Sequence, residues 1–343
     1  MKKIKIDVYD SRKAKKIYKF KKAFFTRLKG KKNVAFKYIH IQIILIFCLS
    51  FLYFLIFKKG KNTLSSLRVA LCTMGKKDNL YIREYIKHYR KLGVDKIFIY
   101  DDNDPKTEKF SDIVNNMLER KYVKVYDNIQ SYIHNQAEAF TNCYNLNKND
   151  YDWFIMVDTD EYLIIVNVTL KNYLSKNIFD KCDFIKINWV IATDNELLHY
   201  ENKSLFERFK GPYQKSIYIK SIIRGKIENL TYWVHSPKIS PIRNVTCNNE
   251  GKQIYYQNMN FESIVNININ KAYIIHFKFK STEEFINKIK RGYGKWFGKR
   301  ITGVINTKIA EYFITNKITR EKVEYIEREL NISLQRYKSY KLI

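Results

Sequence analysis

The sequence predicts an α/β domain in which helices flank a mixed, mostly parallel sheet. Four segments of strand character alternate with helical segments between residues 68 and 157, which is the usual order of elements in such domains. Acidic residues follow the second and the fourth of these strands, and parallel sheets bind ligands beyond the carboxyl ends of their strands. The chain has 343 residues and is 45% hydrophobic, so it can bury the core of one large domain.

Strands and helices alternate in the first half of the domain. Strands are expected at residues 68–73, 96–100, 123–126 and 153–157, and helices at 79–92, 108–120 and 135–146. In the first helix the apolar side chains recur at helical spacing from Ile82 to Leu92, and Gly93 is expected to end it.

The second half departs from strict alternation. Strands are expected at residues 184–190, 216–223 and 272–279, followed by helices at 281–297 and 319–330. No internal repeat or low-complexity linker interrupts the sequence, so we expect one catalytic domain over residues 67–343.

A charge-free apolar run from Ile41 to Phe57 precedes this domain. Such a run is just long enough to cross a bilayer, and we place a single transmembrane anchor at residues 39–57. A buried core helix would show a polar face, and a cleaved signal peptide rarely has about forty residues before its apolar region. Residues 1–38 then form a basic cytoplasmic tail, and residues 58–66 form a short stem.

The charge that flanks the run predicts its orientation. Residues 1–40 hold fifteen Lys and Arg but only two acids, and far fewer basic residues follow the run. Because basic flanks stay in the cytoplasm, we expect a single-pass type II protein with residues 67–343 across the membrane. Residues 67–343 contain five N-x-S/T sequons, which can be glycosylated only if the domain enters a glycosylating lumen. They are at Asn167, Asn202, Asn229, Asn244 and Asn331.

The formal net charge of +29 raises the question of a nucleic-acid partner. Residues 1–40 contribute fifteen positive and two negative charges, and the remaining excess is spread thinly over the rest of the chain. No segment concentrates arginine with stacking aromatic residues, as grooves for single strands do. We therefore expect a lysine-coated surface and no nucleic-acid partner.

Cysteine spacing excludes the common structural zinc motifs, because no C-x-x-C pair occurs. Cys48 lies within the apolar run. Two disulfides in an oxidising compartment and buried free thiols both remain open for the other four: Cys72, Cys143, Cys182 and Cys247.

The acidic run Asp158-Thr159-Asp160 directly follows the fourth strand. Two carboxylates one residue apart in a loop can hold a hard cation such as Mn²⁺ or Mg²⁺, which can stabilise a departing diphosphate. A D-x-D triplet alone is a weak signal, because acidic surface loops are common. Its place after an apolar strand, with Asp101 and Asp102 ending the second strand, strengthens the case for a ligand site.

Four stretches resemble the family-2-like and family-92 glycosyltransferases, which have the GT-A fold, a Rossmann-like mixed sheet flanked by helices. Two of them are specific motifs, and two are moderately so. The stretches are Leu71–Gly93 (LCTMGKKDNLYIREYIKHYRKLG), Val94–Asp104 (VDKIFIYDDND), Asn135–Leu163 with its DTDEYL run, and His276–Gly292 (HFKFKSTEEFINKIKRG). The chain departs from the family at Lys77-Asp78, where the family has an N-E turn, and at His88, to which we assign no role.

The resemblance implies roles for individual residues. Asp158 and Asp160 would bind the metal, and His276 would be either a third metal ligand or a phosphate contact, with a structural role at the end of its strand as the alternative. Contacts to the nucleotide-sugar donor would come from Thr73, Asp101, Asp102, Lys280 and Arg291. The family places an acid after the strand that follows the metal motif, so Asp194 is the first candidate for the general base and Glu196 the second.

The resemblance also implies a function. We expect an inverting hexosyltransferase that uses a nucleotide-sugar donor, a UDP-sugar, and a glycan or glycoconjugate acceptor. The first alternative is a catalytically inactive, membrane-anchored binding or scaffold protein with a GT-A-like fold, and the second is a polyanion-binding protein. Because a Golgi-type lumen receives nucleotide sugars and the far side of a bacterial inner membrane does not, we expect a Golgi or other secretory-pathway membrane.

Overall fold

The computed structural model describes residues 67–115, 121–233, 235–238, 244–254, 267–291 and 301–334. The predicted tail (1–38), anchor (39–57) and stem (58–66) lie outside these residues. Within the described part, no helix combines the length and the apolar character needed to cross a bilayer.

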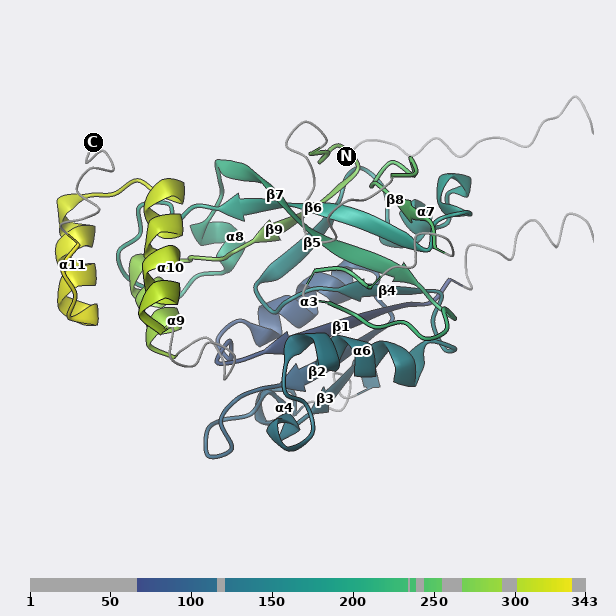
Figure 1. Cartoon of the computed structure of the whole chain (residues 1–343), viewed down its shortest axis with the longest axis horizontal. Helices are drawn as coiled ribbons and strands as arrows, with labels where there is room; N and C mark the ends of the chain where they lie inside the picture. The colour runs from purple at the N-terminus through teal and green to yellow at the C-terminus, as the bar shows by residue number, and fades with distance from the viewer. Residues whose placement is uncertain are drawn as a thin grey trace, which may run out of the picture. The chain divides into compact units, whose positions relative to one another are not determined.

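One mixed sheet of nine strands forms the centre of the described domain (Figure 1). Its strands are β1 (Val69–Gly75), β2 (Lys96–Asp101), β3 (Val123–Tyr126), β4 (Trp153–Met156), β5 (Glu161–Ile165), β6 (Phe184–Ala192), β7 (Tyr213–Arg224), β8 (Thr246–Cys247) and β9 (Ala272–His276). The strand order is β3-β2-β1-β4-β7-β6-β9-β5, and β8 pairs with β6. The first four strands run parallel, whereas β7 is antiparallel to both of its neighbours and β5 is antiparallel to β9. The predicted mixed α/β sheet is thereby confirmed.

Helices cover both faces of this sheet, and others lie beside it. The described helices are α3 (Ile82–Leu92), α4 (Phe110–Ile113), α6 (Gln136–Asn147), α7 (Leu170–Leu174), α8 (Leu205–Arg208), α9 (Thr282–Lys290), α10 (Ile301–Thr315) and α11 (Arg320–Leu330), with 3₁₀ turns η1 (Ile129–Ser131) and η2 (Asn177–Phe179). Figure 1 shows α6 in front of the sheet and α3 behind it.

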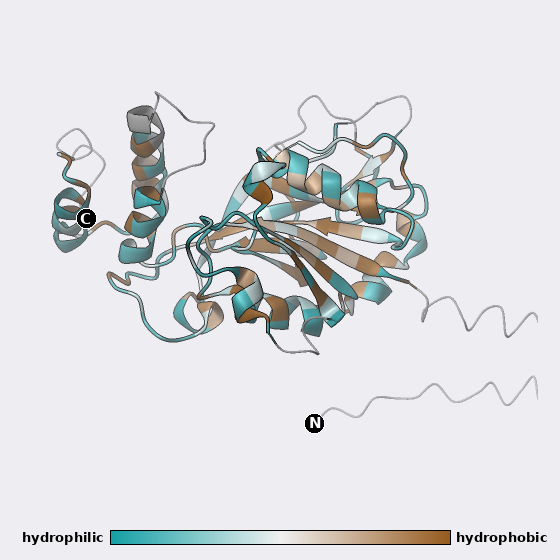
Figure 2. Cartoon of the chain, turned by 90° about the horizontal axis from the view of Figure 1, so that it is seen from below, coloured by the Kyte–Doolittle hydropathy of each residue, from teal (hydrophilic) through white to brown (hydrophobic). Residues whose placement is uncertain are grey.

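The alternation of side chains along the strands explains why both faces are covered. Val69 and Leu71 of β1 lie in one apolar core with Tyr85 of α3, whereas Ala70 lies in a second core with Phe140 of α6. Successive residues of a strand point to opposite faces, so a strand that is apolar throughout requires helices on both sides. In Figure 2 the strands are mainly brown, and brown and teal alternate along the surrounding helices.

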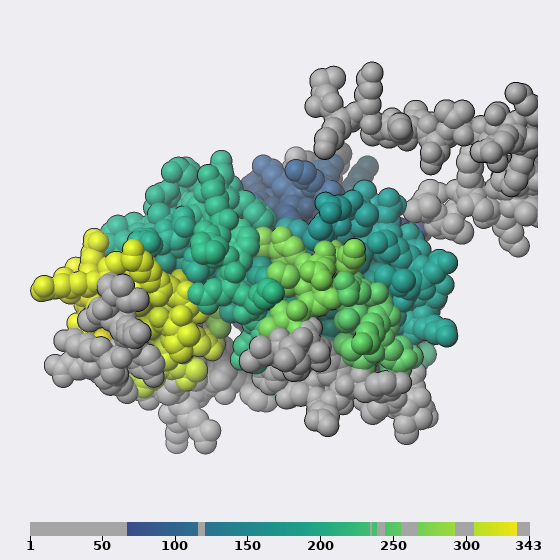
Figure 3. Space-filling view, turned by 90° about the horizontal axis from the view of Figure 1, so that it is seen from above, coloured from purple at the N-terminus to yellow at the C-terminus, as the bar shows by residue number. Residues whose placement is uncertain are grey.

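The C-terminal helices build a third core beside the sheet. Phe285 of α9, Tyr312 of α10 and Ile326 of α11 are buried together there. A polar contact ties this group to the loop after β6, because Lys322 of α11 donates to the Asp194 carboxylate at 2.6 Å. Figure 3 shows the yellow C-terminal residues lying directly against the teal middle of the chain.

All four cysteines left open by the sequence form disulfides. Cys72 of β1 is bonded to Cys143 of α6, and Cys182 is bonded to Cys247 of β8. Each bond joins residues more than sixty positions apart, with separations of 71 and 65. The first bond therefore fastens α6 to β1, and the second fastens β8 to the segment just before β6.

Strand direction gives the sheet two different edges. The carboxyl ends of β1, β2, β3, β4, β6 and β9 meet at one edge, which we call the carboxyl edge, together with the starts of β5 and β7. The opposite edge, the amino edge, holds the start of β1 and the ends of β5 and β7. All of the acidic candidates follow or begin strands at the carboxyl edge.

Candidate active site

The turn at residues 158–160, which we call the DTD turn, connects β4 to β5 at the carboxyl edge. Glu161 opens β5 and is paired with His276, the last residue of β9. On the other side the turn approaches β1 closely, because a Cβ added to Gly75 would lie 2.6 Å from Cγ2 of Thr159. Glycine at position 75 therefore lets the turn pack against the end of β1.

Asp160 lies in the most charged part of the site. Its side chain is 8% exposed, one oxygen lies 3.4 Å from His276 Nε2, and the other accepts from Lys288 Nζ at 2.7 Å. Burial alone would raise the pKa of Asp160, but Lys288 and His276 lower it well below the usual value. Burial lowers the pKa of His276, and the neighbouring Asp160 carboxylate offsets part of this effect.

Asp158 faces the other way and is more accessible, with 27% of its side chain exposed. Its carboxylate accepts a bond from Lys220 of β7 at 2.9 Å and another from Gln136, the first residue of α6. Lys220 also lies 3.7 Å from Glu161, which is fully buried. Burial and the nearby Asp158 charge raise the pKa of Glu161 well above its usual value.

The donor chemistry at this turn fits a hard divalent cation. Asp158 and Asp160 offer carboxylate oxygens, and the buried Nδ1 of His276 has no hydrogen-bond partner among the described residues. Both carboxylates are engaged by lysine ammonium groups, however, and no group of three or more His, Cys, Asp or Glu in the described residues is arranged as a finished cage. A bound cation would have to compete with Lys220 and Lys288 for these oxygens.

The residues expected on the donor side differ in accessibility. Thr73 and Asp101 are completely buried. Asp101 accepts backbone N–H bonds from Asn103 and Phe110, so it shapes the loop after β2. Asp102 is partly exposed and accepts from Gln130 at 3.2 Å. Of the three, Asp102 alone has a carboxylate that a ligand can reach without rearrangement.

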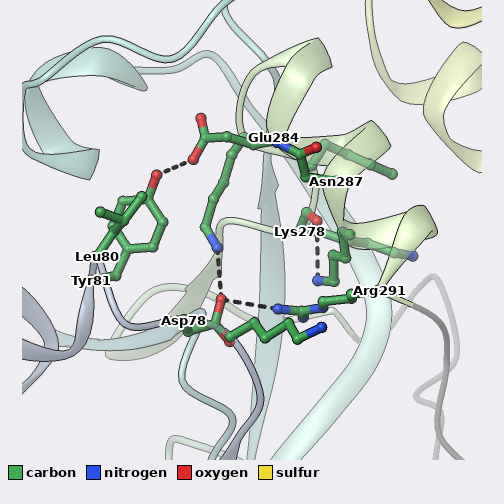
Figure 4. A pocket seen from close by; sticks show the side chains of 11 residues that line it. Asp78, Leu80, Tyr81, Lys278, Glu284, Asn287 and Arg291 are labelled. Atoms are coloured by element: carbon green, nitrogen blue, oxygen red, sulfur yellow. Dashed lines mark hydrogen bonds and ion pairs between the residues drawn. The ribbon is translucent and has the colours of Figure 1, made fainter. Parts of the chain in front are cut away.

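Lys280 and Arg291 meet at a pocket of about 210 Å³ beside the DTD turn (Figure 4). Lys280 Nζ donates to Asp78 at 3.2 Å, and the Arg291 guanidinium lies 3.6 Å from the same carboxylate. Burial would raise the pKa of Asp78, but Lys280 and Arg291 lower it below the usual range. The lining contains five basic residues: Lys77, Lys278, Lys280, Lys288 and Arg291.

The two candidates for the general base occupy different environments. Asp194 is 1% exposed and accepts from Lys322, from the Tyr312 hydroxyl and from the backbone of Glu196. Its oxygens are thus committed to contacts within the protein, and an acceptor hydroxyl has no open path to them. Glu196 keeps 58% of its side chain exposed and pairs with Lys317 at 3.1 Å.

Aromatic rings line the sheet next to His276. The Trp189 ring lies 4.4 Å from the His276 ring, and Tyr218 and His235 lie within 5.4 Å and 5.2 Å of Trp189. Within the part of the chain that the structure describes, the buried indole N–H of Trp189 has no hydrogen-bond partner. This cluster borders the site on the β6–β7 side.

Three residues of the site carried no assigned role in the sequence. Lys220 lies in the middle of an apolar strand, and this placement could have indicated its role. A buried ammonium group is stable only when a carboxylate lies next to it. Lys288 stands one helical turn after Glu284 in the C-terminal motif, and Asp78 stands in the departure from the N-E turn. Which carboxylates these side chains meet depends on the sheet topology.

The sequence of this chain is similar to that of known proteins. Residues 65–300 match the family model described as glycosyltransferase family 92. A family 92 protein of Oryza sativa subsp. japonica is 27% identical over 107 residues, covering 31% of this chain and 18% of the relative. A family 92 protein of Ricinus communis is 20% identical over 94 residues, covering 27% and 16%. The chain thus matches less than a fifth of the length of these relatives.

Solved structures give weaker similarity. The S. aureus TarS structure (residues 1–349) has 12% identity and a TM-score of 0.29, covering 80% of this chain and 74% of that one. The galactosyltransferase LgtC, in complex with donor and acceptor sugar analogues, has 10% identity and a TM-score of 0.21, covering 45% and 57%. Scores this low establish neither a shared fold nor a shared activity.

Proposed function

This chain belongs to glycosyltransferase family 92, and we propose that it transfers a hexose from a UDP-sugar donor to a glycan or glycoconjugate acceptor. We propose that the transfer inverts the anomeric centre and uses Mn²⁺ or Mg²⁺. The observation that carries the proposal is the meeting of Asp158, Asp160 and His276 at the carboxyl edge of a mixed sheet.

The residues of the DTD turn would hold the cation through two carboxylates and one imidazole nitrogen. When bound, such a cation neutralises the diphosphate and stabilises it as a leaving group. Asp102 is the side chain best placed to contact the nucleoside, because it is reachable at the end of β2. Asp101 and Thr73 would act indirectly, since both are buried and shape the strand ends beneath the donor.

We place Glu196 ahead of Asp194 as the general base. A base must reach the acceptor hydroxyl and keep a lone pair free for its proton. The exposed carboxylate of Glu196 meets this requirement, whereas the oxygens of Asp194 hold Lys322 and Tyr312. Glu196→Gln is expected to lower kcat by about two to four orders of magnitude with donor affinity unchanged.

The disulfides support a secretory-pathway location, which we propose as a Golgi-type lumen with the chain in type II orientation. Disulfides persist in oxidising compartments and are rare in the cytosol. Two of them in one domain favour folding across the membrane from the cytoplasm.

The experiment that tests the proposed function is metal-dependent release of UDP from a panel of UDP-hexoses by the purified full-length chain. Asp158→Asn and Asp160→Asn are expected to abolish turnover while thermal unfolding stays cooperative. Asp150→Asn, which changes an exposed carboxylate just before β4, is the matched control and should turn over normally. A wild-type rate for Asp160→Asn at saturating Mn²⁺ would reject the metal assignment.

A binding or scaffold role is the second candidate, and one observation favours it. Asp158 and Asp160 are both ion-paired with lysines, as they would be in a protein that needs no cation. Tight UDP-sugar binding with no hydrolysis or transfer at any Mn²⁺ or Mg²⁺ concentration would select this role over catalysis.

A further inference from the structure

Two lysines balance the carboxylates of the DTD turn. Lys220 Nζ donates to Asp158 Oδ1 at 2.9 Å, and Lys288 Nζ donates to Asp160 Oδ2 at 2.7 Å. Each aspartate of the turn is therefore paired with one ammonium group. The two negative and the two positive charges cancel, so this part of the site is neutral before any cation binds.

The core around Lys220 fixes its position. The side chain of this β7 residue is 1% exposed, and its ammonium group lies 5.5 Å from the centre of the Phe140 ring on α6. Burial alone would lower the pKa of Lys220, but the Asp158 and Glu161 carboxylates raise it above its usual value. Lys220 is therefore a fixed positive charge beside the turn.

Gln136 contacts the same oxygen of Asp158 as Lys220 does. Its Nε2 donates to Asp158 Oδ1, because an ionised carboxylate can only accept. Since both donors meet Oδ1, neither of them takes Oδ2, and 27% of the Asp158 side chain is exposed. The two contacts fix the direction of the carboxylate and leave its second oxygen for a ligand.

The start of α6 supports Gln136. Asn135 caps this helix, because its side-chain oxygen accepts from the Glu138 N–H at 3.0 Å, and Gln136 is the first helical residue. The disulfide between Cys143 and Cys72 bonds the same helix to β1. Gln136 thus reaches the turn from a rigid element, which is the arrangement expected of a residue that orients a metal ligand.

The two kinds of contact have opposite effects on a cation. An ammonium group next to a carboxylate repels a divalent cation at that carboxylate, and the repulsion is strong where water is scarce. A neutral amide adds no such repulsion and holds the carboxylate in one orientation. Loss of a contact that orients a metal ligand typically weakens metal binding by about 10–100-fold.

We infer that three residues outside the ligand set determine the affinity of the DTD turn for a divalent cation. Lys220 and Lys288 lower this affinity because they are resident counter-ions of the two aspartates. Gln136 raises it because it is the positioning residue for the Asp158 carboxylate. The inference rests on the proposed function, in which the cation is the cofactor.

Mn²⁺ alone is the probe, titrated calorimetrically into the purified full-length chain. Lys220→Met and Lys288→Met are each expected to tighten Mn²⁺ binding by about tenfold or more, because each removes a positive charge beside a ligand. Lys215→Met, which changes an exposed lysine on the same strand as Lys220, is the matched control and should bind Mn²⁺ as the wild type does.

The counter-ion role is overturned if neither variant binds Mn²⁺ more tightly than Lys215→Met. Lys288→Met carries this test alone if Lys220→Met fails to fold, because the side chain of Lys288 is 22% exposed and its loss buries no unpaired charge as deeply as the loss of Lys220 does.

Gln136→Met tests the positioning role and is made in the Lys288→Met chain, whose tighter binding keeps a weakened affinity measurable. It is expected to weaken Mn²⁺ binding by about tenfold or more relative to that parent. The matched control is Gln214→Met, because the Gln214 side chain donates to the Thr315 carbonyl at 2.6 Å on the exposed part of β7. A merely structural role for Gln136 would lower the unfolding temperature and leave the Mn²⁺ affinity unchanged, which would overturn the positioning role.

The readouts distinguish the inference from the proposed function. A chain that shows these shifts in Mn²⁺ affinity but transfers no sugar would refute the function and leave the inference standing. A chain whose sugar transfer requires Mn²⁺, while the lysine and glutamine variants bind Mn²⁺ as their controls do, would refute the inference alone.

Discussion

His88 illustrates how a single side chain is fixed by its surroundings rather than by a catalytic role. It lies on α3, its Nε2 is 2.9 Å from the Leu163 carbonyl, and its ring stacks on Phe206 with centroids 5.7 Å apart. Because the carbonyl can only accept, the neutral ring donates from Nε2. Burial lowers the pKa of His88 to about 4, so the folded protein keeps this ring neutral in mild acid.

This lowered pKa predicts a pH-dependent stability. Between pH 6.5 and 4 the unfolded chain binds a proton at His88 that the folded chain does not, so stability falls as the pH falls. The loss attributable to His88 reaches about 3 kcal/mol at the bottom of this window. His88→Gln should flatten the decline in the free energy of unfolding, measured by urea denaturation at several pH values.

The control for this prediction is His199→Gln, since the His199 ring is 61% exposed. Its profile is the reference against which the flattening in His88→Gln is judged. If the free energy of unfolding of His88→Gln falls from pH 6.5 to 4 as steeply as that of the wild type, protonation of His88 does not contribute to the loss of stability.

At the scale of elements, the C-terminal helices are held by a buried ion pair. The carboxylate of Asp194 and the ammonium of Lys322 are 1% and 2% exposed and lie 2.6 Å apart. Lys322 also donates to the Lys317 carbonyl, and Asn316 accepts from the Asp194 N–H. The loop after β6 is therefore fastened to α10 and α11 by polar groups that are shielded from water.

Breaking this pair from one side is expected to be costly. Lys322→Met should lower the free energy of unfolding by about 3–5 kcal/mol, because it leaves a buried carboxylate without its partner. Asp194→Asn combined with Lys322→Met should cost less than the sum of the single changes. Lys317→Met, which removes an exposed lysine, is the control for urea denaturation. If Lys322→Met is no more destabilising than Lys317→Met, the ion pair does not hold these helices.

Elements with a clear period were predictable from the sequence, and those without one were not. β3 was predicted at its observed bounds, and α3 ends at Gly93, whose φ of 103° is the left-handed conformation that glycine favours. The sequence did not predict β5, because its residues overlap the DTDEYL motif that was assigned to the site. It did not predict α10, because the apolar residues of this segment do not lie on one face of a helix. The sequence around β5 does not reveal the strand, because β5 is stabilised by pairing with β9, which lies about a hundred residues later.

The candidate site was predictable to the level of strand ends, but not to the level of contacts. Asp158, Asp160 and His276 lie together because parallel strands bring their carboxyl ends to one edge. The sequence also placed Asp194 at that edge, but its burial against Lys322 depends on α11, more than a hundred residues later. Long-range ion pairs of this kind have no local signature.

At the scale of the whole domain, the sequons have a position that the sequence did not show. Asn167 follows β5 and Asn229 follows β7, so both lie near the amino edge, and both are exposed. If the domain enters the secretory lumen as proposed, Asn167 and Asn229 should carry N-glycans that leave the carboxyl edge open. Asn167→Gln and Asn229→Gln should each remove one endoglycosidase-sensitive glycan from the chain made in eukaryotic cells, with transfer activity unchanged.

A chain from such cells that shows no endoglycosidase-sensitive mass at either position would contradict the lumenal location. Retained transfer by the doubly substituted chain is the control for folding. Loss of transfer in that chain would place one of these residues closer to the site than the sheet topology indicates.

The start of β1 at the amino edge has a practical consequence. Residue 67 lies at this edge, on the side away from the DTD turn, so a support attached at residue 67 leaves substrates free to approach. A chain captured on a solid support through residue 67 is therefore expected to keep its full turnover. Capture through residue 334 instead places the support next to α11, whose Lys322 holds the loop that carries Glu196.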